Sequence, residues 1–233
     1  MLLRNKLQKS KNNFSKKNKS QTQLKMSKSN NFEHPVYSRN VIEFVTVAVE
    51  FCNYIEQSKK VEASQFSSAM LKIFPLAYLK ASMLPEIVSE EENFNGTFVT
   101  EEIYNYIQEI ISAKLAENDL VCEVPETVSQ NGENTIATLS EIIADIYQDL
   151  KNFVMSYRTN KENIMAESLW TCKQNFEQFW GTRLLAAQPA FHKLVYGNTD
   201  WQVVKSNERK TANKVYTDNW IISKRQQEWA NEF

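Results

Sequence analysis

Two carboxylates and an arginine have the types and spacing that could form a site. Asp145 and Asp149 are four residues apart, so in a helix they lie one turn apart on the same side. Helical phase puts Asp149 on the rim of an apolar stripe and Asp145 just outside it. Arg183 falls on the rim of a second stripe, beside Trp180. If the two faces pack together, Asp149 and Arg183 are the expected charge pair, since a guanidinium suits a bidentate bridge to a carboxylate.

His192 is the other nearby residue whose chemistry would matter, as a general base or a metal ligand. Asp145, Asp149 and His192 would have to converge to hold a divalent ion. Because His192 lies off the main stripe, a capping or surface role near the helix end is the alternative. The sequence holds no P-loop, G-x-G-x-x-G, H-E-x-x-H or G-x-S-x-G motif, so no cofactor is predicted.

The candidate groove therefore consists of five residues. They are Asp145, Asp149, Trp180, Arg183 and His192. Alternatively, its charged residues form only structural ion pairs or are solvated at the surface.

Apolar residues recur at helical spacing through the body of the chain. The spacing predicts helices over about Asn40–Gln57, Ala63–Leu84, Glu101–Glu117, Leu139–Arg158 and Glu162–Tyr196. The chain has only four glycines and five prolines, which argues against a β-sandwich or a Rossmann fold. We expect an all-α fold, a single bundle of five to six amphipathic helices with short links.

Helix start signals are visible at three places. Asn40 with Glu43, and Thr138 with Glu141, have the spacing of capping boxes. Thr100 is suited to cap the third helix.

Several irregularities are also expected. Pro75 should kink or divide the second helix, and Gly181 and Pro189 could bend the fifth or split it in two. The stretch Leu120–Val124 looks extended but is too short for a sheet alone, and residues 125–135 read as a polar loop.

The first 31 residues differ in composition from the rest. Residues 1–30 hold nine basic residues and no acidic one, which leaves 18 basic against 28 acidic residues, a net charge of −10, for the remainder. Such a basic arm should be disordered. It could tether the chain to nucleic acid or another anionic surface. Alternatively, translation begins at Met26 and the arm is a mis-called start.

We expect residues 32–197 to form the bundle and residues 198–233 to pack onto it through their tryptophans. Trp201, Trp220 and Trp229, among mixed charges, could instead stack on nucleic-acid bases.

Cysteine usage and hydropathy indicate a compartment. Cys52, Cys122 and Cys172 are scattered and odd in number, which is typical of buried, reduced thiols in a cytoplasmic protein. No apolar run reaches the roughly 18 residues that a membrane span needs, so no membrane partner is predicted.

Four segments together resemble DUF5063, a bacterial helical domain-of-unknown-function family. They are Val41–Glu56, Leu76–Pro85, Asp145–Lys151 and Phe176–His192, and the resemblance covers about Tyr37–Val195. It implies a cytoplasmic, all-α bacterial protein, and it implies no activity.

The function that best fits these features is a helical protein-interaction (adaptor) module with an unknown protein partner. A metal-dependent hydrolase using the helix carboxylates is one alternative. A nucleic-acid-associated protein, acting through the basic arm and the C-terminal aromatic residues, is the other.

Overall fold

The structure is a computed structural model that describes residues 34–88, 96–125 and 134–201. The expected N-terminal arm and residues 126–133 of the expected polar loop lie outside the described residues. Of the C-terminal segment only residues 198–201 are described, and there Trp201 is partly buried against the core. Trp220 and Trp229 lie outside the described ranges.

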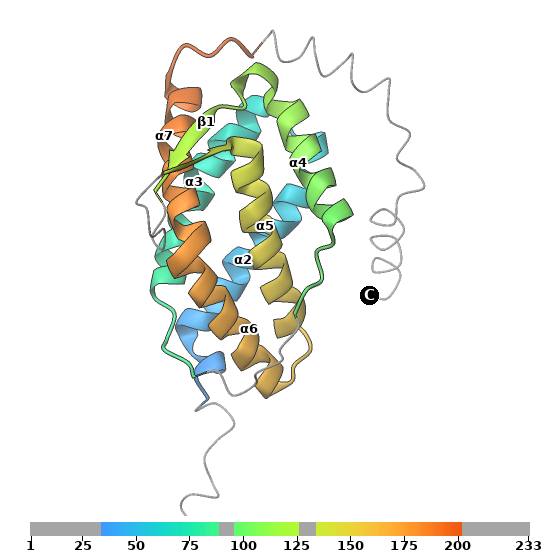
Figure 1. The fold of residues 1–233 in the computed structure, drawn as a ribbon, viewed down its shortest axis with the longest axis vertical. Helices are drawn as coiled ribbons and strands as arrows, with labels where there is room; N and C mark the ends of the chain where they lie inside the picture. The colour runs from blue at the N-terminus through green and yellow to red at the C-terminus, as the bar shows by residue number, and fades with distance from the viewer. Residues whose placement is uncertain (1–33, 89–95, 126–133, 202–233) are drawn as a thin grey trace, which may run out of the picture.

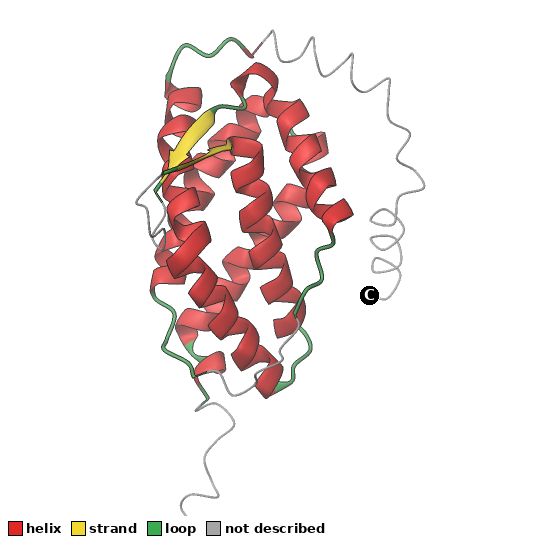
Figure 2. Ribbon diagram, in the orientation of Figure 1, coloured by secondary structure: helices red, strands yellow, loops and turns green. Residues whose placement is uncertain are grey.

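The described residues form a mostly helical bundle with one small sheet (Figures 1 and 2), which confirms the expected fold class. The order of elements is η1 (Pro35–Tyr37), α2 (Arg39–Gln57), η2 (Ser58–Lys60), α3 (Ala63–Ser82), α4 (Glu101–Leu115), η3 (Ala116–Asn118), β1 (Val121–Val124), β2 (Thr135–Thr138), α5 (Leu139–Tyr157), α6 (Glu162–Asn175), η4 (Phe176–Trp180) and α7 (Gly181–Tyr196).

Helix α5 packs against α2, α4 and α6, while α3 packs against α2 and α7. Apolar side chains at helical spacing meet in one continuous core. An example is the edge-to-face contact between Phe74 of α3 and Phe191 of α7, whose ring centroids are 5.5 Å apart. Cys52, Cys122 and Cys172 are buried free thiols, as expected.

Two of the predicted helix starts are confirmed. The Thr100 hydroxyl accepts a hydrogen bond from the Ile103 amide at 3.4 Å. Thr138 and Glu141 form a complete capping box at the start of α5. This box fixes the first turn of the helix that carries Asp145 and Asp149.

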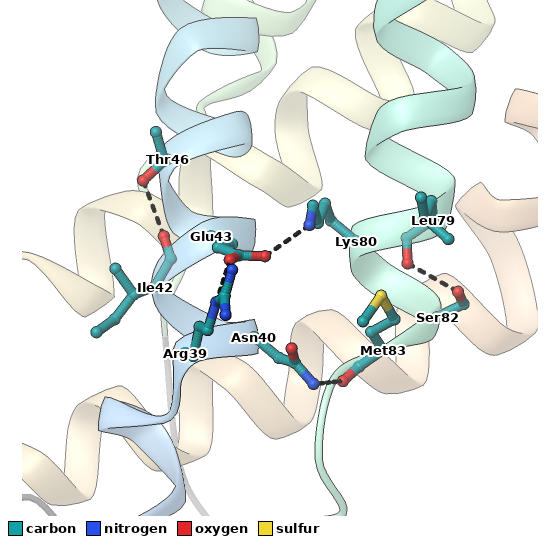
Figure 3. A network of polar contacts seen from close by, with 9 residues as sticks. All are labelled: Arg39, Asn40, Ile42, Glu43, Thr46, Leu79, Lys80, Ser82 and Met83. Carbon is teal, nitrogen blue, oxygen red and sulfur yellow. Dashed lines mark hydrogen bonds and ion pairs between the residues drawn. The ribbon is translucent and has the colours of Figure 1, made fainter.

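The predicted Asn40–Glu43 capping box is wrong, because α2 begins one residue earlier, after Ser38. The Asn40 side chain instead donates to the Met83 carbonyl at 3.0 Å. Glu43 forms ion pairs with Arg39 and with Lys80 (Figure 3). Both residues therefore tie α2 to the end of α3.

Helix α3 continues through Pro75 and is not divided there. Proline has no N–H, so the carbonyl four residues earlier loses its helical donor. That carbonyl belongs to Leu71, and the Gln188 side chain of α7 donates to it at 3.0 Å. A side chain from a neighbouring helix thus supplies the missing hydrogen bond.

The stretch expected to be extended contains strand β1, and its partner strand β2 begins at Thr135, where the expected polar loop ends. Strand β1 pairs with β2 in antiparallel register, with Cys122 opposite Ala137. These two residues face the core while Val121 and Ile136 are exposed. Each strand is only four residues long, too short for alternation to be recognised in the sequence.

The end of α4 is strained at Ala116, which has φ 49° and ψ −118°. This is the first central position of a type II′ turn, which glycine strongly prefers. We expect Ala116→Gly to raise the free energy of unfolding by about 1 kcal/mol, because strain relief exceeds the added entropy of the unfolded chain. Urea denaturation would measure the gain. A loss of stability, or no change, would contradict the assigned backbone conformation.

The predicted fifth helix is continuous from Glu162 to Tyr196, but it contains a π-helical turn, η4, between α6 and α7. The Gly181 amide donates to the Phe176 carbonyl, five residues earlier. Such turns insert one residue and shift the helix face.

Gly181 is the residue that this turn requires. A Cβ atom here would lie 2.5 Å from the Phe176 carbonyl oxygen and 3.0 Å from its ring. We expect Gly181→Ala to lower the free energy of unfolding by about 1–3 kcal/mol, the cost of overpacking a core. Denaturant unfolding of Gly181→Ala and of Thr182→Ala, a more exposed control, would test this. Equal stability of the two variants would show that the space is available.

Candidate functional site

Asp145 and Asp149 lie one turn apart on α5, on the side that meets the long helix formed by α6, η4 and α7. Asp149 lies opposite Asn175, whose side-chain amide donates to Asp149 Oδ1 at 2.6 Å. Asp145 lies opposite the segment that follows the π-helical turn.

Arg183 pairs with Asp145, so the predicted Asp149–Arg183 pair is wrong. Arg183 Nε is 3.1 Å from Asp145 Oδ2, and both side chains are largely buried. The Nε–H makes no hydrogen bond, so the contact is an ion pair. The two helices run antiparallel, and Arg183 is eight residues, or about 12 Å, beyond Asn175. It therefore reaches the earlier carboxylate on α5.

Two further contacts hold this ion pair in place. The Tyr104 hydroxyl of α4 donates to Asp145 Oδ1 at 2.9 Å. The Arg183 guanidinium carbon lies 4.0 Å from the centroid of the Phe179 ring, a cation–π contact. Phe179 itself is 40% exposed. Burial, the largest influence, raises the pKa of Asp145 although Tyr104 and Arg183 act in the opposite direction.

Asp149 lines a cavity of about 200 Å³, the Asp149 cavity, between α5, α6 and residues 96–97. Its walls are Gly96, Thr97, Asp149, Asn152, Phe153, Ser156, Ser168, Thr171, Cys172 and Asn175. Most of these side chains are polar, so the cavity can form hydrogen bonds with a small ligand.

Burial raises the pKa of Asp149 to about 6. The hydrogen bond from Asn175 lowers it and the nearby Asp145 raises it, but both effects are smaller than burial. Asp149 therefore changes charge in the cavity near neutral pH. Strongly shifted pKa values in a cleft are characteristic of functional sites.

Several hydrogen-bonding groups of the cavity are already engaged. The Asn152 amide oxygen accepts from the Phe98 and Val99 amides at 2.7 and 2.9 Å. The Ser168 hydroxyl donates to the Met165 carbonyl. These bonds fix the walls of the cavity before any ligand enters.

Of the five predicted groove residues, Asp149 lines the cavity, and Asp145, Arg183, Trp180 and His192 are not among its wall residues. Trp180 has no exposed surface and donates from Nε1 to the Cys172 carbonyl at 3.3 Å. It is a core residue. His192 is exposed and contacts the Tyr196 ring, with centroids 4.8 Å apart.

Asp145, Asp149 and His192, which would have to converge to hold a divalent ion, are not grouped together in the described structure. Within residues 34–88, 96–125 and 134–201, no three His, Cys, Asp or Glu side chains are grouped so that they could hold a metal ion. Across the same ranges, no helix has the length and apolar character needed to cross a membrane.

A family model described as a domain of unknown function, DUF5063, matches residues 35–197. The chain belongs to the DUF5063 family. The match includes Asp145, Asp149 and the whole long helix from Glu162 to Tyr196.

A solved structure supports the same assignment. The DUF5063 chain is 38% identical to protein BF1032 from Bacteroides fragilis, with a TM-score of 0.61. The similarity covers 70% of this chain and all of BF1032. Among curated proteins, none matches this chain. Neither the family description nor the BF1032 title states an activity.

Sequence analysis of this DUF5063 protein missed the neutral residues of the site. Asn175 and Asn152 carry no charge and follow no motif, so only the alignment of the helices places them beside Asp149. Phe179 carries no sequence signal that sets it apart from the other aromatic residues of this helix. The antiparallel direction of the two helices is the signal that could have helped: residues later in the long helix, such as Arg183, face residues earlier in α5.

Proposed function

We propose that this DUF5063 protein is a helical protein-interaction module that docks a partner segment over Phe179 and the Asp149 cavity. The observation that carries the proposal is the Asp149 cavity, a polar recess with walls held by internal hydrogen bonds. Binding sites combine such fixed polar groups with apolar contact area.

The exposed Phe179 ring supports the proposal as the apolar anchor. Its cation–π partner Arg183 pairs with Asp145, which lies one turn from Asp149 on α5, so the ring lies on the side of the long helix that faces α5. The guanidinium of Arg183 holds one face of the ring. Aromatic and arginine side chains fixed in this way are enriched among residues that dominate binding energy.

The proposed location is the cytoplasm. The three buried free thiols support it, because oxidising compartments favour disulfides.

The test is selection of peptides from a random displayed library on the full chain, followed by affinity measurement by fluorescence anisotropy. Phe179→Ala should weaken the selected peptides at least tenfold, since truncating an interface anchor costs over 1 kcal/mol. Leu185→Ala is the matched control, because Leu185 is also an exposed apolar residue but on another side of the helix. The proposal fails if no peptide binds saturably or if both variants bind equally well.

A further inference from the structure

The Asp149 cavity holds an acidic group for which the described part of the chain shows no cationic partner. Arg183 pairs with the neighbouring carboxylate, Asp145. Among the described residues that line the cavity, none is lysine, arginine or histidine. Asp149 Oδ1 accepts a hydrogen bond from the neutral side-chain amide of Asn175.

The groups that face Asp149 leave hydrogen-bond acceptors for a ligand. Asn175 uses its amide nitrogen on Asp149, so its amide oxygen can accept from a ligand. The Ser168 hydroxyl donates to Met165 and keeps its lone pairs. Phe153 supplies an apolar wall. A cavity with one acid, several acceptors and an apolar wall is complementary to a cation on an alkyl chain.

We infer that the Asp149 cavity binds a primary ammonium group, supplied by a lysine side chain of the partner segment. This inference rests on the proposed function and names the chemistry that the partner must carry. An ammonium is favoured over a guanidinium because Asn175 already uses one acceptor site of Asp149 Oδ1, which leaves fewer sites for a bidentate fork. A compact ammonium with three donors needs only single acceptors.

Size and net charge agree with this ligand. A cavity of about 200 Å³ has room for several water molecules, and therefore for the end of a lysine side chain. Beyond residue 30 the chain carries a net charge of −10, which attracts a basic segment.

The pH dependence of binding follows from the groups around Asp149. On α5 the other charged group nearby is Asp145, which is paired with Arg183 of α7 and bonded to Tyr104 of α4. On α6 the facing groups are the neutral Asn175 and the Cys172 thiol, whose pKa burial raises well above its usual range. Asp149 is therefore the group that titrates against the ligand, and an ammonium should bind more tightly once Asp149 is ionised.

The probe is n-butylammonium, titrated into the full chain and followed by NMR chemical shifts. We expect saturable binding with millimolar affinity, as for other very small ligands, that is about tenfold weaker at pH 5 than at pH 7.5. Asp149→Asn should abolish it. Glu109→Gln, which removes an exposed carboxylate of α4, is the matched control and should leave binding unchanged. The neutral probe 1-butanol should not bind.

Three results would overturn the inference: no saturable shift with n-butylammonium, equal binding by Asp149→Asn and wild type, or tighter binding of n-propylguanidinium. The peptide selection and the n-butylammonium titration can fail independently of each other. Selected peptides that bind but do not require lysine would leave the interaction module in place and remove its ammonium pocket. Binding of n-butylammonium without any peptide binding would retain the pocket and remove the interaction module.

Discussion

Replacing Trp180 by alanine should lower the free energy of unfolding by about 3–5 kcal/mol, the usual cost of truncating a large buried aromatic side chain. Trp180 has no exposed surface. Its ring lies 4.7 Å from that of Phe176, and its indole N–H donates to the Cys172 carbonyl. The truncation would leave a cavity inside the bundle, while the Cys172 carbonyl would keep its helical hydrogen bond from the Phe176 amide.

Urea denaturation followed by far-UV circular dichroism would measure this loss. Trp170→Ala is the control, since Trp170 is on the same long helix but only partly buried. A loss at Trp170 as large as that at Trp180 would contradict the assigned packing. The comparison also shows why Phe179, and not Trp180, is the residue to change in a binding experiment.

Asp149→Asn should stabilise the protein by up to about 3 kcal/mol at pH 7.5 and have almost no effect below pH 4. Burial raises the pKa of Asp149 to about 6 in the folded protein, against a value of 3.8 without burial. Between these values the folded state keeps a proton that the unfolded state has released, so stability falls as pH rises. The asparagine variant avoids ionisation in the cavity, and its amide oxygen can still accept from Asn175.

Unfolding free energies of wild type and variant, measured from pH 4 to pH 8, would test this. The difference should grow between pH 4 and pH 6 and then level off, because above the folded pKa both states are ionised. Asp145 is common to both proteins, so its contribution largely cancels. Glu109→Gln, which removes an exposed carboxylate of α4, is the control. A constant offset for Asp149→Asn would show that Asp149 titrates normally.

The order of helices was predictable because it depends on signals that lie close together in the sequence. Apolar spacing located α5, and Thr138 with Glu141 marked its start. The one-turn separation of Asp145 and Asp149 follows from the same periodicity. Each of these inferences needs only a few neighbouring residues.

The contacts across helices were not predictable, because they depend on the register between elements. The apolar periodicity shows which face of its own helix Arg183 lies on, but it does not show which residues of α5 lie beside it. The sequence therefore could not decide whether Arg183 pairs with Asp145 or with Asp149. The π-helical turn before Gly181 adds a further shift. The short strand pair, with Cys122 opposite Ala137, likewise became clear only once its distant partner was present.

The hydrogen bond between Gln188 and the Leu71 carbonyl has a consequence for motion in the bundle. Because Pro75 removes the helical donor, sliding or separation of α3 and α7 would leave that carbonyl without a protein donor. The two helices can then move apart only in steps that break this bond, so they should open together rather than independently. In hydrogen exchange, amides along the α3–α7 contact should form one cooperative unit.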